Sequence, residues 1–209
     1  LVRSYGRPEA EVNDLLGDLM QRGRNPEVGT AAALGEITVR INAAADSAAT
    51  ADALLAAAEH DVRERLSWAV FGGADDTLAS AVGGLLRERA QKLAVAESCT
   101  GGLVAALLTD TPGSSDYFAG GLLVYSNELK QSLANVPAEL LAEHGAVSAS
   151  VAEALARGVR ERCQVDFGLS VTGIAGPGGG TDEKPVGLVY LGLADAAGVI
   201  SRELRLGAG

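Results

Sequence analysis

The sequence KLAVAESCTGGLVAALLTD, residues 92–110, decides the fold class because it joins a short strand directly to a helix. Its first part is a run of small apolar residues, which is typical of a strand that is buried on both faces. Its second part stays apolar for two helical turns, and Gly101 and Gly102 stand at the junction. A strand that leads straight into a helix is the repeating unit of α/β domains.

The same alternation continues along the chain to residue 206. Strands are predicted for FAGGLLVYSN, residues 118–127, and DFGLSVTG, residues 166–173, with helical NELKQSLAN, residues 127–135, between them. Ser150 and Glu153 have capping-box spacing and predict a helix to about Cys163. The last two apolar segments predict a hairpin around residues 196–198. We therefore expect a layered α/β/α domain.

A smaller α/β unit precedes this domain. RPEAEVNDLLGDLMQRG predicts a helix from Pro8 to Arg22 and Gly23, EITVRINA predicts a half-buried strand, and residues 50–66 predict an alanine-rich helix. Residues 72–76 form a turn-rich break, after which Asp76 can cap the next helix. The predicted domains are residues 1–76 and 77–209.

Composition excludes several functional classes. The formal charge is −10 over 209 residues, which opposes a general nucleic-acid binder, because such proteins neutralise phosphates with Lys and Arg. No run of about 18 apolar residues predicts a membrane span. Cys99 and Cys163 lack paired spacing, so we expect a reducing cytoplasm and neither a disulfide framework nor a metal site. Because the sequence starts at Leu1, we expect it to be a piece of a longer protein.

Ser98 stands at the turn between the deciding strand and its helix. Unpaired backbone N–H groups at the start of a helix can stabilise a negative charge, so Ser98 could be a nucleophile and the following amides an oxyanion hole. The alternative is that Ser98 or Thr100 simply caps the helix.

A serine nucleophile needs a base, and histidine is scarce in this chain. His60 belongs to the smaller unit, and His144 lies in the HGAVS loop, residues 144–148. A lysine can serve if burial lowers its pKa, and Lys130 follows the strand 118–127 on the first turn of a helix. The alternative is an exposed helix lysine.

A third segment, VTGIAGPGGGTDEKPVG, residues 171–187, places a glycine-rich loop after a strand. Such a loop can cradle a phosphate or a ribose, or be only a flexible turn. It matches neither a P-loop nor a Rossmann fingerprint.

Taken together and in order, AESCTGG, GSSDYFAGGLLVYSNELK, HGAVS and TGIAGPGGGTDEKPVG resemble the C-terminal domain of the CinA family, also found alone as nicotinamide-nucleotide amidase. The resemblance runs from about residue 77 to residue 206. RSYGRPEAEV, the pair Asn25 and Pro26, and EITVRI resemble the KH-like linking domain of full-length CinA proteins.

The resemblance implies a deamidase that converts nicotinamide mononucleotide to nicotinate mononucleotide and ammonia, without a cofactor or metal. It places the nucleophile on Ser98, the lysine base on Lys130, a tyrosine that helps to position the proton on Tyr125, and the substrate-loop hydroxyl on Thr172. The further substrate-binding positions that we expect are Thr100, Gly101, Gly102, Asn127, Gly173 and Gly176.

The resemblance also implies a homodimer, and a substrate-binding arginine in a G-x-R-x-x-V-R segment after the last strand. The sequence ends at LRLGAG, residues 204–209, before such a segment. The alternative function is a nucleotide-binding regulatory module of a competence or damage response, without catalysis.

Overall fold

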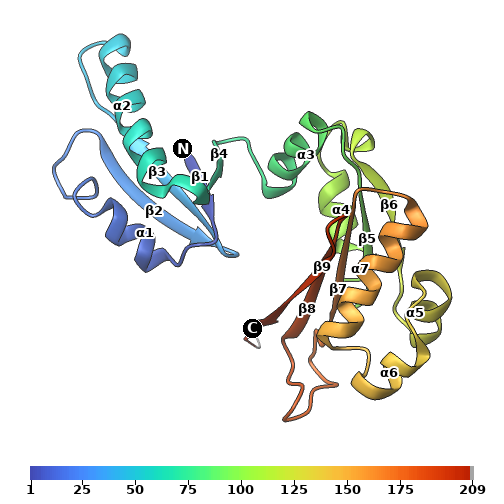
Figure 1. Ribbon diagram of the computed structural model, residues 1–209. Helices are drawn as coiled ribbons and strands as arrows, with labels where there is room; N and C mark the ends of the chain where they lie inside the picture. Colours follow the sequence, from blue (N-terminus) through green and yellow to red (C-terminus); the bar gives the residue numbers. More distant parts are fainter. Residues whose placement is uncertain (208–209) are drawn as a thin grey trace. The chain divides into compact units, whose positions relative to one another are not determined.

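The computed structural model describes residues 1–207, which fold as two compact units divided after Ala81 (Figure 1). No helix in this described part is long and apolar enough to cross a membrane.

The first unit is an antiparallel sheet with two helices. Its elements are β1 (Val2–Tyr5), α1 (Glu9–Leu16), β2 (Glu27–Ala33), β3 (Glu36–Asn42), α2 (Ala48–Leu66) and β4 (Val70–Gly72). The sheet order is β2-β3-β1-β4. Residues from both helices and three of the strands form one apolar core, for example Val12, Val39 and Val62. The predicted α2 and β3 are confirmed.

Helix α1 is shorter than the sequence predicts. It ends at Leu16, with Gly17 as its C-cap, rather than near Gly23. Glycine disfavours a helix interior by about 1 kcal/mol relative to alanine. Val12 and Leu16 are already buried, and Leu19 reaches the same core from the following turn, so a longer helix is not needed to cover it.

The second unit alternates strands and helices around a five-stranded sheet of order β6-β5-β7-β8-β9. Strands β5, β6 and β7 are parallel, and β8 and β9 return antiparallel to β7. The elements are α3 (Leu78–Glu88), β5 (Leu93–Glu97), α4 (Leu103–Thr109), β6 (Phe118–Leu123), α5 (Asn127–Ala134), α6 (Ala138–His144), α7 (Ala149–Cys163), β7 (Phe167–Gly173), β8 (Leu188–Ala194) and β9 (Val199–Arg205).

Strand β5 lies in the middle layer, as its sequence predicts. Its Ala94 and Ala96 belong to the core that α7 covers, whereas Val95 packs with Leu86 of α3 and Leu108 of α4 on the other face (Figure 1). Every residue of β5 is buried. The layered α/β/α prediction and the β8–β9 hairpin are confirmed.

Two predicted helix caps are wrong. The N-cap of α7 is Ser148, whose hydroxyl accepts from the Val151 amide, and not Ser150. Asp76 does not cap α3, because its carboxylate accepts from the Gly73 amide in the preceding turn. In both places a neighbouring polar residue makes the bond instead: Ser148 at α7, and Thr77 at α3, whose hydroxyl accepts from the Ser80 amide.

Candidate active site

Ser98 directly follows β5, at the carboxyl ends of the parallel strands. Its amide donates to the Val171 carbonyl of β7 at 3.0 Å, and the residue is only 7% exposed. The chain then turns through residues 99–102 into α4. The serine therefore lies at the carboxyl ends of the parallel strands, where ligands bind in open α/β folds.

Lys130 reaches Ser98 from the neighbouring helix. Ser126 caps α5, which directs Lys130 back toward the ends of β5 and β6. Its Nζ lies 3.1 Å from Ser98 Oγ, and 2.8 Å from each of the carbonyl oxygens of Val124 and Tyr125. The side chain is 1% exposed, so the pair is shielded from water.

The environment of Lys130 favours the neutral amine. Burial disfavours the ammonium and lowers the pKa of Lys130 below its usual value. The nearby Cys99 and Glu128 act in the opposite direction but do not reverse the shift. This is the perturbation that a lysine general base requires.

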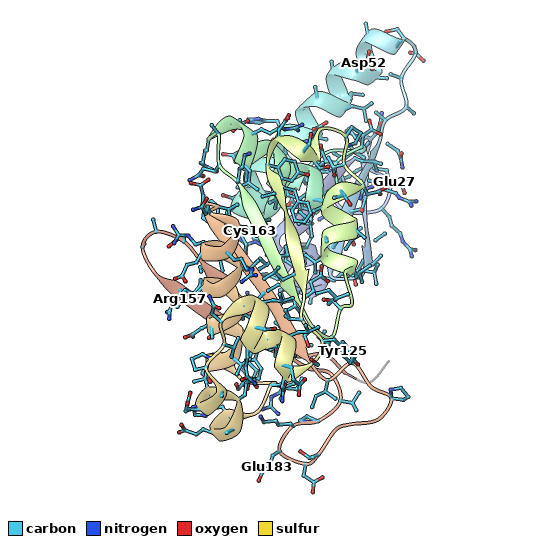
Figure 2. The ribbon with its side chains drawn as sticks, turned by 90° about the vertical axis from the view of Figure 1, so that its right-hand side faces the viewer. Glu27, Asp52, Tyr125, Arg157, Cys163 and Glu183 are labelled. Carbon is cyan, nitrogen blue, oxygen red and sulfur yellow. The ribbon has the colours of Figure 1, made fainter. Side chains whose placement is uncertain are left out.

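Tyr125 enters the site differently from the sequence-based expectation. Its ring is 73% exposed, and it is the backbone carbonyl, not the phenol, that contacts Lys130. Figure 2 places Tyr125 at the end of the domain that also carries the long loop with Glu183. Among the described residues, the hydrogen bonds of Lys130 go to Ser98 and to backbone carbonyls, and none goes to the Tyr125 phenol.

The predicted oxyanion donors also need correction. The Gly102 amide donates to Glu97 Oε2 at 3.1 Å, and the Gly101 amide donates to the Ser98 carbonyl at 3.2 Å. Within residues 1–207, the amides of Cys99 and Thr100 have no such acceptor. They are the two N–H groups next to Ser98 that remain available.

A pocket of about 820 Å³ opens beside this turn. Cys99 and Thr100 line it on one side, and the glycine-rich loop and the β8–β9 hairpin line the other. Its other side chains are apolar, and none of its lining residues in the described part of the chain is Lys or Arg. Thr100 Oγ1 is buried and has no hydrogen-bond partner in the described part of the chain.

Residues 75–209 match the CinA C-terminal domain, and residues 1–72 match the KH domain of damage-inducible protein CinA. The chain belongs to the CinA family. It is 48% identical over 207 residues to a CinA-like protein of Parasynechococcus marenigrum, with 99% of this chain and 49% of the relative covered. A CinA-like protein of Synechococcus elongatus is 49% identical over 208 residues, with 100% and 49% covered. The chain spans about half the length of these curated CinA relatives.

Solved structures of the CinA superfamily share the fold. The competence/damage inducible protein CihA of Agrobacterium tumefaciens has a TM-score of 0.61 and 42% identity, covering 62% of this chain and 79% of that chain. A competence-damaged protein (CinA) superfamily protein of Escherichia coli has a TM-score of 0.61 and 30% identity, covering 66% and 82%.

The remaining residues predicted from the CinA resemblance fall into two groups. Gly176 lines the pocket, and Gly173 ends β7 beside it. Thr172 is buried, and its hydroxyl donates to the Ala146 carbonyl at 2.8 Å, so it holds the loop before α7. Asn127 is exposed at the first position of α5 and lies outside the pocket lining.

His144, the other candidate base, has contacts of its own. Its ring lies 3.7 Å from Glu143, and its carbonyl accepts from Lys184. No group of three or more His, Cys, Asp or Glu suited to a metal occurs among residues 1–207.

Glu97 is a residue of this site that the family resemblance does not predict. It closes β5 and is 2% exposed, which is unusual for a carboxylate. Its position directly before Ser98 in an otherwise apolar strand was the available signal.

Proposed function

We propose that this chain carries an amidohydrolase site that deamidates nicotinamide mononucleotide through a covalent acyl intermediate on Ser98. The observation that carries the proposal is the buried 3.1 Å contact between Lys130 Nζ and Ser98 Oγ. A serine within hydrogen-bond reach of a base whose pKa is lowered has the geometry of an activated nucleophile. The CinA resemblance supplies the substrate.

The contacts of Lys130 suit a neutral amine as well as an ammonium. A neutral amine donates its two N–H groups to the Val124 and Tyr125 carbonyls and keeps a lone pair. That lone pair then faces Ser98 Oγ and accepts the hydroxyl proton. The two carbonyls thus orient the base toward the serine.

The steps follow from this arrangement. Lys130 takes the Ser98 proton as Oγ bonds to the amide carbon, and the carbonyl oxygen becomes an oxyanion facing the free amides of Cys99 and Thr100. The Lys130 ammonium gives its proton to the amide nitrogen as the C–N bond breaks, so that ammonia leaves. Lys130 then takes a proton from water as the water oxygen bonds to the ester carbon, and it returns that proton to Ser98 Oγ as the ester bond breaks.

The pocket fits the aromatic part of the substrate better than its phosphate. Apolar side chains such as Val104, Val171 and Leu204 can enclose a pyridine ring. The substrate phosphate needs a cation, which must come from a residue other than those that line the pocket in the described part of the chain. The CinA resemblance places such an arginine in the segment after the last strand.

The decisive experiment measures nicotinate mononucleotide and ammonia formed from nicotinamide mononucleotide. We expect equimolar products from a chain that extends through the arginine segment, and a higher KM from residues 1–209 alone. Absence of product from both would refute the proposed activity.

Cys99 tests whether the nucleophile is the serine or the adjacent thiol. Burial raises the pKa of Cys99, so it stays a thiol at neutral pH and is a poor nucleophile. We expect Cys99→Ala to keep kcat within about threefold of wild type, because only a small lining group is lost. Cys163→Ala is the matched control, since Cys163 ends α7 toward the opposite end of the sheet (Figure 2). A loss for Cys99→Ala as large as that for Ser98→Ala, in folded protein, would move the nucleophile to sulfur.

We also propose that the chain forms a homodimer through α4 and β6. Strand β6 is an edge strand of the sheet, and its Leu123 is exposed. Helix α4 packs beside β6 and exposes Leu103 and Leu107. An uncharged edge with neighbouring apolar side chains favours association. Light scattering should give twice the chain mass of 21.2 kDa, and Leu107→Gln should lower it. The same change at the exposed Leu85 of α3 is the control. A monomer across micromolar concentrations would contradict the proposal.

A further inference from the structure

Glu97 is a buried carboxylate to which the proposed reaction assigns no step. Its side chain lies on the α4 side of β5 and accepts three backbone N–H groups at the amino end of that helix. Oε2 accepts from Gly102 and Val104 at 3.1 Å each, and Oε1 accepts from Ala105 at 2.8 Å. A carboxylate suits this place because the unpaired amides and the helix dipole favour negative charge.

These hydrogen bonds restrain the turn of residues 99–102, whose two glycines allow many backbone conformations. Gly101 and Gly102 have φ angles of 62° and 102°, in the left-handed region where glycine is free to move. The Ser98 amide binds the Val171 carbonyl at the start of the turn, and the Gly102 amide binds Glu97 at its end. Two hydrogen bonds within the turn, from Gly101 to the Ser98 carbonyl and from Leu103 to the Thr100 carbonyl, shape it, and the Glu97 carboxylate fixes its end to β5.

The Glu97 carboxylate also limits which backbone amides of the turn are available to a substrate. It occupies the amino end of α4, so a substrate phosphate cannot bind there. It holds the Gly102 amide, while the Gly101 amide is held by the Ser98 carbonyl. The amides left free are those of Cys99 and Thr100, beside the pocket.

We infer that Glu97 is a positioning residue, whose carboxylate anchors the turn that carries Ser98 and leaves the Cys99 and Thr100 amides to face the oxyanion. The inference rests on the proposed function, because an oxyanion arises only in acyl transfer. It adds a residue that touches neither substrate nor Lys130 and acts through the backbone of the turn.

The test compares Glu97→Gln and Glu97→Asp with wild type in the full-length protein. In Glu97→Gln, the side-chain NH₂ group must face at least one of the three backbone donors, so the turn shifts. A displacement of about 1 Å near the reacting atoms costs about 10- to 100-fold in rate, so we expect that loss in kcat with KM within about twofold. Glu97→Asp keeps the charge but is one methylene shorter, so we expect a smaller loss. Glu139→Gln, an exposed carboxylate in the first turn of α6, is the matched control and should behave as wild type.

Two readouts separate this inference from the proposed function. One is turnover of nicotinamide mononucleotide, and the other is the rate at which a fluorophosphonate probe labels Ser98, which does not depend on the identity of the substrate. If wild type has no turnover, the proposed substrate is wrong, and slower labelling of Glu97→Gln still supports the positioning role. Circular dichroism shows whether each variant folds. If Glu97→Gln does not fold, the kcat and labelling rate of Glu97→Asp decide the test. A folded Glu97 variant with wild-type kcat and labelling rate overturns the inference, as does a wild type that neither turns over nor labels.

Discussion

Ser98→Ala is expected to lower kcat for deamidation of nicotinamide mononucleotide by about 10³- to 10⁶-fold, the range typical of losing a catalytic nucleophile. The reason is that Cys99 and Lys130 are poor substitutes for the serine: Cys99 is held as a thiol, and Lys130 contacts Ser98 Oγ and backbone carbonyls. Substrate binding should survive, because only the hydroxyl is removed from the residue.

The measurement combines turnover with a direct binding titration. Ser115→Ala, on the exposed turn before β6, is the matched control and should retain wild-type values. The variant also separates an enzyme from a regulatory nucleotide-binding module. A module would bind the nucleotide equally well in wild type and Ser98→Ala and would turn over neither. Residual turnover above 10% in folded Ser98→Ala would remove Ser98 from the reaction.

The sequence predicts the central layer of this domain well, because its signals are local. Residues 93–96 are apolar without alternation, and β5 is buried on both faces. The glycine pair after Ser98 predicts a sharp strand-to-helix turn, and both glycines have positive φ. Lys130 was predicted on the first turn of α5, and the cap at Ser126 explains why that turn faces β5.

The contacts that the sequence did not predict depend on choices between equivalent partners. Tyr125 follows a strand, but its position in the sequence does not tell whether its ring or its carbonyl faces Lys130. In the structure the carbonyl contacts Lys130 and the side chain is exposed. The Gly102 amide could serve either a substrate or the protein, and Glu97 takes it through a contact five residues back in the chain. Thr172 was expected to present its hydroxyl to the substrate, and it donates instead to Ala146, 26 residues away. Such long-range hydrogen bonds leave no periodic pattern in the sequence.

Lys130→Arg is expected to lower kcat by about 10²- to 10⁴-fold, the usual contribution of a general base. Arginine keeps its proton at all relevant pH values, so it cannot take the Ser98 proton. In wild type, burial lowers the pKa of Lys130 below the usual value of about 10.4. The neutral amine is the active form and its fraction grows as pH rises, so kcat should rise through an apparent pKa below 10.4 and then level off.

The measurement is kcat from pH 6 to pH 10 for wild type, Lys130→Arg and Lys130→Met. Methionine removes the amine with little change in shape, so it should also be nearly inactive, and it decides the outcome if arginine disturbs the buried site. Lys92→Arg, an exposed lysine just before β5, is the control for the same substitution and should keep the wild-type profile.

The competing hypothesis makes Lys130 a permanently charged contact for the substrate phosphate. In that case Lys130→Arg would retain kcat, and Lys130→Met would mainly raise KM. The buried contacts of Nζ favour the base, because Val124, Tyr125 and Ser98 already surround the amine. A folded Lys130→Arg variant with wild-type kcat would therefore end the Ser98–Lys130 mechanism.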